Sequence, residues 1–135
     1  MILVYGAIGR YNFGDLIFPH VANNVIQSCK SIDRDVQFCD ILSRDMTPHG
    51  GMNVRSVFDF VDSDQEVDVI HVGGETGACS IDNAVHMFQP QSSHYHEMKR
   101  LNEYKKRYNL AYLLPKTIFK NPGRFVTNCI GGTSA

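Results

Sequence analysis

The sequence predicts an open α/β fold, with a mostly parallel sheet and helices on both faces. Apolar runs of strand length alternate along the chain with segments of helical periodicity, and three of the runs end at glycine turns. Strands that alternate with helices need crossover connections, which favour a parallel sheet over a barrel or a sandwich. The 135 residues contain no internal repeat and no long linker, so we expect one domain over 1–135.

Five segments are the predicted strands. Residues 2–5 form a short, continuous apolar run that ends at Gly6, as expected for a strand covered on both faces. Residues 67–72 form the clearest buried strand and end at a second glycine turn. The other three candidates are 36–42, 110–114, which Pro115 shortens, and 124–130.

Four segments have the spacing of helices. The first follows the glycine-rich loop after residue 5, with Asp15 as a candidate N-cap. Its apolar residues recur every four positions and predict one helical face, made of Ile17, Val21, Val25 and Cys29. Apolar spacings also predict helices over 54–61, over 82–88 and over 95–108. The step Gln89-Pro90 should end the third helix.

The charge of the chain argues against nucleic acid or an anionic membrane surface as a partner. The formal net charge is -1, from 13 Lys and Arg against 14 Asp and Glu. The one basic concentration, over 99–107, has Glu97 and Glu103 at helical spacing, so we interpret it as a solvated helix face, with phosphate binding as the alternative. No apolar run reaches the roughly 18 residues of a membrane span.

The cysteine and histidine patterns predict no metal site. The four cysteines are scattered, without a C-x-x-C pair. His94 and His96 stand two apart on a predicted helix and should face different directions. The chain also starts without the pattern of a signal peptide, and we expect a cytoplasmic location with reduced thiols.

The predicted ligand site lies where three glycine turns meet. In an open α/β sheet, ligands bind at the carboxyl ends of the strands, where glycine lets a backbone N–H approach an anionic or hydroxyl-rich ligand. The loop Gly6 to Asp15, GAIGRYNFGD, matches neither the dinucleotide-binding pattern nor the P-loop, so no nucleotide cofactor is expected. For each of the three glycine turns, the alternative is a tight turn that binds no ligand. The candidate substrate-binding residues are Gly9, Asn12, Phe13, Gly14, Gly73, Gly74, Asn128, Gly131 and Gly132.

Two acids at this edge are the candidate catalytic residues. Asp15 can cap the helix, bind a sugar hydroxyl or accept a proton. Glu75 follows the second glycine turn, and paired carboxylates across a cleft move protons in sugar chemistry. Phe13 can stack on a sugar, although a place in the core is favoured. His71, inside a buried strand, is interpreted as a hydrogen-bonded core residue.

The loop residues Asn12-Phe13-Gly14-Asp15, between a first strand and a helix, resemble the opening signature of the polysaccharide pyruvyl transferase family. The stretch Asp68-Val-Ile-His-Val-Gly-Gly is similar to a second glycine motif of that family, which commonly has a third glycine where this chain has Glu75. The stretch from Arg124 to Gly132 resembles a later strand that ends in a glycine pair.

The resemblance implies a Rossmann-like N-terminal domain, one half of a GT-B-like two-domain architecture. Such enzymes transfer the pyruvyl group of phosphoenolpyruvate to a sugar of a surface polysaccharide. Asn12, Asp15 and Glu75 would then face the acceptor saccharide, while phosphoenolpyruvate would bind to a C-terminal domain that this chain lacks. The chain alone would be inactive.

Two other functions stay open. One is a non-catalytic carbohydrate-binding or assembly module, and the other is a small enzyme, complete in itself, that acts on a nucleotide sugar or a phosphate compound. Half of a two-domain enzyme would expose the apolar face that meets its other half. We therefore expect self-association through that face.

Overall fold

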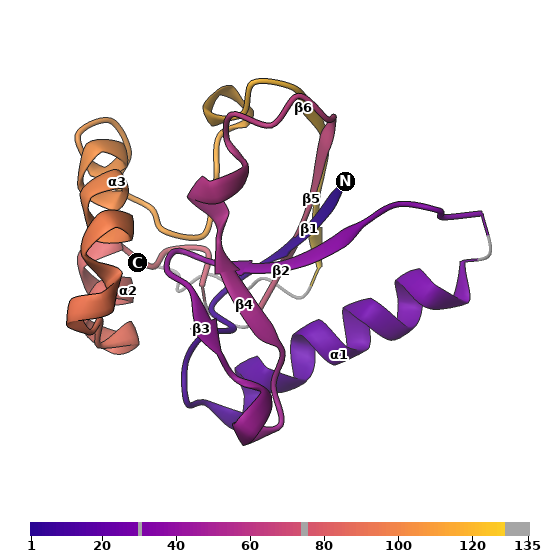
Figure 1. The fold of residues 1–135 in the computed structure, drawn as a ribbon, viewed down its shortest axis with the longest axis horizontal. Coiled ribbons are helices and arrows are strands. Elements are labelled where there is room, and N and C mark those ends of the chain that lie inside the picture. The colour runs from indigo at the N-terminus through magenta and orange to yellow at the C-terminus, as the bar shows by residue number, and fades with distance from the viewer. Residues whose placement is uncertain (30, 74–75, 129–135) are drawn as a thin grey trace.

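The computed structural model describes residues 1–29, 31–73 and 76–128, which form an α/β fold around one sheet (Figure 1). The sheet has six strands in the order β3-β4-β2-β1-β5-β6. In chain order these are β1 (Ile2–Tyr5), β2 (Val36–Asp40), β3 (Arg44–Asp45), β4 (Asn53–Ser56), β5 (Val67–Val72) and β6 (Pro122–Asn128). Within these residues all neighbours pair in parallel except β3, which runs antiparallel to β4. The predicted α/β class and mostly parallel sheet are confirmed.

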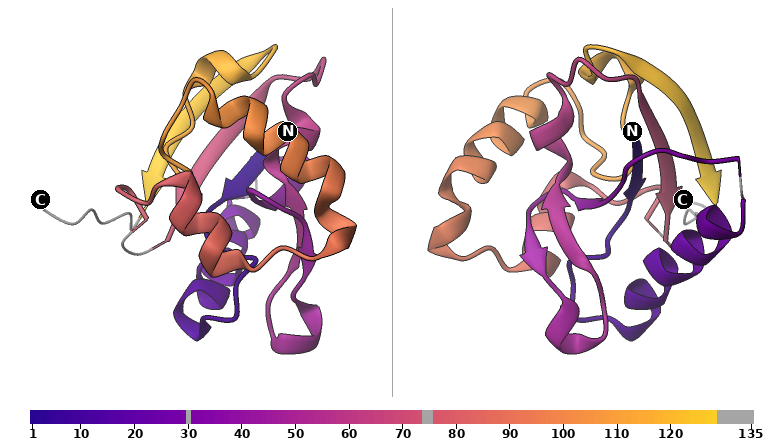
Figure 2. Two further views of the ribbon diagram at one scale, coloured as in Figure 1. Left: turned by 90° about the vertical axis from the view of Figure 1, so that its left-hand side faces the viewer. Right: turned by 45° about the vertical axis from the view of Figure 1, so that its right-hand side comes forward.

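Helices cover both faces of the sheet. α1 (Phe13–Ser28) lies on one face, and α2 (Ile81–Phe88) and α3 (Tyr95–Lys105) lie on the other (Figure 2). Alternate residues of β1 join two hydrophobic clusters: Ile2 and Val4 pack on the α1 side, and Leu3 and Tyr5 on the α2 and α3 side. The strand is therefore buried on both faces, which is why its sequence is continuously apolar.

α1 packs on the sheet through a stripe that differs from the predicted one. The apolar residues that it buries are Leu16, Pro19, Ala22 and Ile26. The predicted face is exposed instead, and it consists of Ile17, Val21, Val25 and Cys29. Both stripes are apolar, so packing against the sheet rather than periodicity decides which stripe is buried.

The predicted helix over 54–61 is wrong in its first half. Arg55 and Ser56 pair with β2 and so belong to β4, and only Val57–Phe60 form a short 3-10 helix. Pairing with a neighbouring strand outweighs a helical spacing of only four apolar residues. The hairpin of β3 and β4 was not predicted.

The predicted strand over 110–114 is also wrong. Leu110 makes only an isolated bridge with Ser80, and the rest of the segment has no strand partner among the described residues. The segment is held to the sheet by side-chain hydrogen bonds instead. The Tyr5 hydroxyl donates to the carbonyl oxygen of Ala111, and the Tyr112 hydroxyl donates to the carboxyl group of Asp40. The segment therefore packs on the sheet as a buried loop.

The other predicted elements are confirmed, with some shifted ends. The predicted strands 2–5 and 67–72 have the bounds of β1 and β5, whereas β2 ends at Asp40, two residues early. α2 begins after Ser80, whose side chain accepts a hydrogen bond from the N–H of Asn83, and it ends at Phe88, before the Gln89-Pro90 step, as predicted. α3 is shorter than predicted. β6 begins two residues early, and the predicted positions 129 and 130 lie outside the described residues.

The basic stretch over 99–107 lies on the surface of α3 and the turn after it. Lys99, Arg100, Lys105, Lys106 and Arg107 are all exposed, which confirms the interpretation as a solvated face. Three of these residues form ion pairs, with Asp59, Asp82 and Glu103 as the partners. No helix in the described part of the chain is long and apolar enough to cross a membrane.

Candidate functional site

The carboxyl ends of three neighbouring strands lie at one edge of the sheet. β1 pairs with β5 in parallel, with Tyr5 opposite His71, and β5 pairs with β6 in parallel, with Val72 opposite Asn128. The chain moves outward from β1 through β2 on one side and from β5 through β6 on the other, so the strand order reverses between β1 and β5. This is the position at which open α/β sheets bind ligands.

Asp40, at the end of β2, holds the first loop at this edge. Its Oδ2 accepts a hydrogen bond from the N–H of Gly9 at 2.9 Å. Its Oδ1 accepts from the N–H of Ile41 at 2.6 Å and from the hydroxyl of Tyr112 at 2.9 Å. The carboxyl group is fully buried, and burial raises its pKa to about 6, against the lowering effect of these hydrogen bonds. The loop therefore has a fixed anchor.

Gly9 meets this anchor at a point where no side chain fits. A Cβ atom at this position would lie 2.7 Å from the ring of Phe88 and 3.2 Å from Oδ2 of Asp40. Gly14 differs, because a Cβ there would meet only the side-chain oxygen of Asn12, at an ordinary 3.5 Å. Of the two predicted glycines in this loop, only Gly9 is required by close packing.

Asp15 forms a buried ion pair and does not cap α1. Arg10 Nη2 donates to Asp15 Oδ2 at 2.8 Å, and the two side chains are only 12% and 8% exposed. Burial raises the pKa of Asp15, and the charge and hydrogen bond of Arg10 oppose that rise. The helix is capped by Asn12, whose Oδ1 accepts from the N–H of Gly14 at 3.1 Å, so the N-cap prediction for Asp15 is wrong.

Phe13 is exposed, and its predicted place in the core is wrong. The residue is 79% accessible to solvent because it lies at the first position of α1, on the same side as the exposed stripe. Asn12 beside it is exposed as well. An aromatic ring and an amide thus stand together at the end of an anchored loop, where both can contact a ligand.

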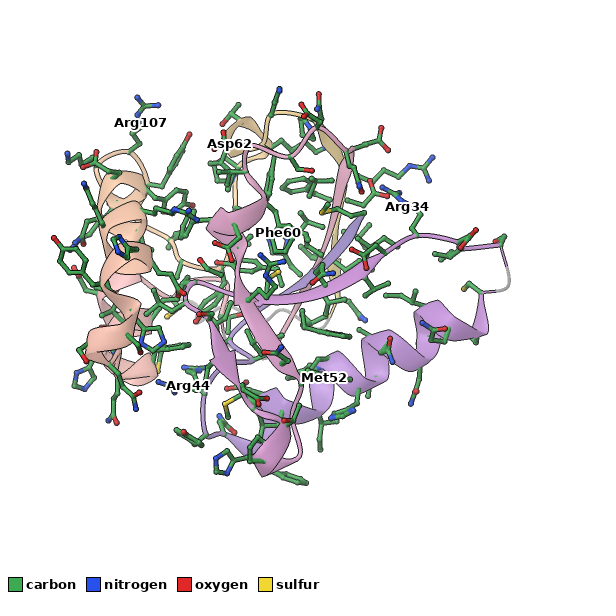
Figure 3. The ribbon with its side chains drawn as sticks, in the orientation of Figure 1. Arg34, Arg44, Met52, Phe60, Asp62 and Arg107 are labelled. Carbon is green, nitrogen blue, oxygen red and sulfur yellow. The ribbon has the colours of Figure 1, made fainter. Side chains whose placement is uncertain are left out.

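A cavity of about 430 Å³ lies beside this loop. Most of the side chains that line it are polar: Arg10, Tyr11, Asn12, His86 and Gln89, with Met87. Arg44 reaches from β3 towards α2 and fastens the loop to the end of that helix (Figure 3). Its guanidinium donates to the carbonyl oxygens of Gly9 and Phe88, at 3.1 and 2.9 Å, and stacks over the Phe88 ring.

The second and third glycine turns are described only in part. Gly73 has a φ of 138°, in the region that favours glycine, and a Cβ there would lie 3.2 Å from Oγ1 of Thr76. Asn128 is the last residue of β6. The predicted residues Gly74, Glu75, Gly131 and Gly132 lie outside the described residues, so the structure brings Gly9, Asn12, Phe13, Gly14 and Asp15 together but leaves the second candidate acid unplaced.

His71 is buried in β5 but is not hydrogen-bonded as predicted. Neither ring nitrogen has a partner among the described residues, and the residue is 3% exposed. Burial lowers its pKa to about 4, so the ring is neutral at neutral pH. Its ring meets those of Tyr5 and Phe125 edge to face, with centroids 5.6 and 6.0 Å away. A histidine within a mostly apolar strand was the sequence signal for this position.

His94 is buried and His96 is exposed. His94 accepts from the N–H of Gln91 through Nδ1, at 2.9 Å, and its Nε2 donates to the carbonyl oxygen of Ser43, at 2.7 Å. Both ring nitrogens therefore hold the turn before α3. Among the described residues, no group of three or more His, Cys, Asp or Glu side chains is placed to bind a metal ion.

Comparisons with protein-family models, with curated proteins and with solved structures found no significant match to this chain.

Proposed function

We propose that this chain is the acceptor-binding, Rossmann-like half of a GT-B-like enzyme that resembles the polysaccharide pyruvyl transferases. The proposal rests on the family-like loop over 6–16 and on one observation of the fold: β1, β5 and β6 run in parallel and end at one edge. The parallel strands follow the order β4-β2-β1-β5-β6, which suits a doubly wound sheet.

The anchored loop supports a saccharide as the ligand. Gly9 is held by Asp40 and Arg44, while Asn12 and Phe13 stay exposed at the end of the loop. An exposed ring can stack on the apolar face of a sugar, and an amide can exchange hydrogen bonds with its hydroxyls. The nearby cavity adds the polar side chains of Arg10 and Gln89.

The proposed reaction forms a ketal from phosphoenolpyruvate and two hydroxyls of the acceptor sugar. The two sugar oxygens bond to the central carbon of the pyruvyl group, inorganic phosphate leaves, and of the two hydroxyl protons one goes to the methylene carbon and one to phosphate. Asp15 is the candidate proton acceptor on this domain, although its ion pair with Arg10 must open first. The phosphoenolpyruvate site belongs to the second domain in this proposal.

Replacing Phe13 with alanine tests the acceptor site. Methyl glycosides of galactose, glucose and mannose are titrated into the protein and followed by NMR. We expect millimolar binding of at least one glycoside and a loss of roughly fivefold or more in affinity for Phe13→Ala, because the stacking surface is removed. Tyr95→Ala on α3, where the residue is 70% exposed, is the matched control and should bind like the original protein.

Two results would contradict this proposal. If Phe13→Ala and Tyr95→Ala bind the glycosides equally well, Phe13 is not part of the site. If the original protein binds none of the glycosides, the proposed site does not exist. Micromolar binding of phosphoenolpyruvate to this chain would overturn the proposed division between the two domains.

A non-catalytic assembly module is the second candidate function, favoured by the exposed stripe of α1. Phe13, Ile17, Val21 and Val25 are between 42% and 79% exposed and recur every four residues. Contiguous apolar surface of this kind marks a protein interface. The proposed second domain of the enzyme, or a second copy of this chain, would cover it.

Self-association through the stripe is expected to depend on Val21. Sedimentation velocity over a range of protein concentrations should show a dimer that Val21→Glu converts to a monomer, because a buried charge would oppose the contact. A monomer at all concentrations in the original protein would count against a second copy as the partner.

A further inference from the structure

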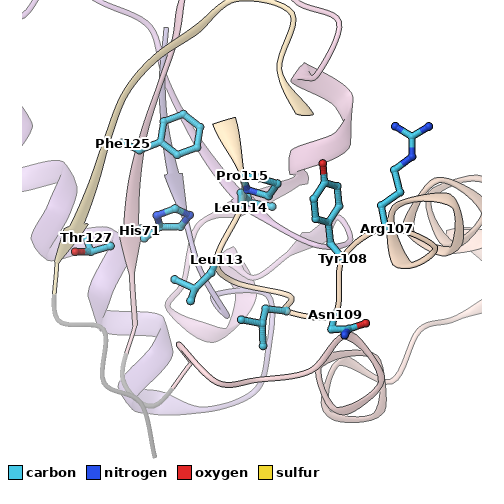
Figure 4. A pocket seen from close by; sticks show the side chains of 10 residues that line it. His71, Arg107, Tyr108, Asn109, Leu113, Leu114, Pro115, Phe125 and Thr127 are labelled. Atoms are coloured by element: carbon cyan, nitrogen blue, oxygen red, sulfur yellow. The ribbon is translucent and has the colours of Figure 1, made fainter. Parts of the chain in front are cut away.

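A larger cavity, of about 550 Å³, opens between the sheet and the segment that follows α3 (Figure 4). It shares no lining residue with the cavity beside the first loop. β5 and β6 form one wall, and residues 107–115 form the other. Most of the lining is apolar, from Tyr108, Leu110, Leu113, Leu114, Pro115 and Phe125. Its volume is ordinary for a small-molecule site.

The imidazole of His71 lies in the wall of this cavity and lacks a polar partner. Figure 4 shows the ring pointing between Phe125 and Leu113, towards the cavity. Both ring nitrogens are buried and unpaired among the described residues. Buried polar groups in folded proteins almost always have a partner, so an unpaired imidazole calls for an explanation.

The aromatic neighbours of His71 do not supply that partner. The rings of Tyr5 and Phe125 meet the imidazole in T-shaped arrangements and bring no polar atom to it except the Tyr5 hydroxyl. The Tyr5 hydroxyl is already used, since it donates to the carbonyl oxygen of Ala111 at 2.5 Å. The described residues leave both ring nitrogens without a partner, so a molecule in the cavity is the remaining candidate.

The chemistry of the site selects an uncharged ligand. A neutral imidazole has one donor and one acceptor nitrogen, and an apolar cavity disfavours the burial of a charged group. Arg107 is the one charged residue of the lining, and it projects into solvent from the turn after α3 (Figure 3). We propose that this cavity binds a small, uncharged molecule with an apolar body and a single hydroxyl or carbonyl group, which hydrogen-bonds to His71.

Three probes of similar size test this proposal. Phenol has the required hydroxyl, toluene lacks it, and benzoate carries a charge. Each is titrated into isotope-labelled protein, and the signals of the His71 ring and the Leu113 methyl groups are followed by NMR. We expect phenol to bind about fivefold or more tightly than toluene, and benzoate to bind more weakly than phenol.

Two variants separate the hydrogen bond from the cavity. His71→Leu should abolish the preference for phenol over toluene while apolar binding persists. Leu113→Trp should abolish binding of both, because Leu113 is 40% exposed and a larger side chain there can fill the cavity without entering the core.

Four outcomes would overturn the proposal: no binding of phenol, equal binding of phenol and toluene, tighter binding of benzoate, or phenol binding that survives Leu113→Trp. None of them bears on glycoside binding at Phe13, so this site and the proposed acceptor site can fail independently.

Discussion

Replacing His71 with leucine is expected to raise the free energy of unfolding by about 1–2 kcal/mol at pH 8. The imidazole buries two nitrogens that lack partners among the described residues, and leucine removes both without leaving a void of any size. Urea denaturation measures the change. His94→Leu is the matched control: His94 is 7% exposed, but both of its nitrogens are bonded, so its removal should lower the free energy of unfolding by a similar amount.

The gain from His71→Leu should grow as the pH falls. Burial lowers the pKa of His71 from 6.5 to about 4, so the unfolded chain binds a proton in this range more readily than the folded one. The stability that depends on the neutral ring is fully present above pH 6.5 and is lost as the pH falls through 4. The advantage of the variant should therefore increase by about 2–3 kcal/mol between pH 8 and pH 4.5. A gain that does not change with pH would mean that His71 takes up a proton freely in the folded protein.

Replacing Asp40 with alanine should produce the largest loss of stability, about 4–5 kcal/mol at pH 4. The substitution leaves the N–H groups of Gly9 and Ile41 and the hydroxyl of Tyr112 without their acceptor, in a fully buried place. Asp40→Asn is the control, since its oxygen can still accept from Ile41 and Tyr112 while its NH2 group opposes the N–H of Gly9. We expect a smaller loss for asparagine, and faster hydrogen exchange at the Gly9 amide in both variants.

The loss in Asp40→Ala should shrink as the pH rises. Burial raises the pKa of Asp40 from 3.8 to about 6, so the folded protein holds this proton more tightly than the unfolded chain. The contribution of Asp40 to stability is complete below pH 3.8 and is reduced as the pH rises through 6. The deficit of the alanine variant should fall by about 2–2.5 kcal/mol between pH 4 and pH 7, to about 2 kcal/mol. A deficit that grows with pH would show that Asp40 ionises at an ordinary pKa and is stabilised by its charge.

These two buried groups oppose each other between pH 4 and 6. As the pH rises over this range, the unfolded chain loses a proton from Asp40 that the folded protein keeps, which lowers the free energy of unfolding. The unfolded chain also holds a proton on His71 that the folded protein lacks, so the free energy of unfolding rises with pH by a similar amount. The free energy of unfolding of the original protein should thus depend little on pH through this pair. Each single variant should show the pH dependence that the remaining group causes.

The strands at the centre of the sheet could be predicted from the sequence, and the packing of α1 could not. β1 and β5 are short, mostly apolar runs that end at glycine, and this is the pattern of strands that are buried on both faces of a parallel sheet. α1 carries two apolar stripes, and only the contacts with the sheet decide which of them is buried. β4 was missed for a similar reason, because its pairing with β2 is a contact between segments distant in the chain.

The edge of the site could also be predicted, because parallel strands must end together, but its anchors could not. The bond from Gly9 to Asp40 joins residues 31 positions apart, and the Tyr112 bond to Asp40 spans 72. No sequence pattern predicts either of these long-range hydrogen bonds. His71 was visible as a polar residue in an apolar strand, yet only the structure reveals that its nitrogens are unpaired and that a cavity lies beside it.

The loop that walls the larger cavity is fastened at two successive residues. Tyr5 bonds the carbonyl oxygen of Ala111, and Tyr112 bonds Asp40, while the nearby Leu110 and Leu113 remain 36% and 40% exposed. Access to the cavity therefore needs only rotation of these leucine side chains, which takes picoseconds to nanoseconds, and no rearrangement of the backbone. A small molecule should associate at a rate close to the diffusion limit, and differences in affinity among such molecules should lie in how quickly they leave.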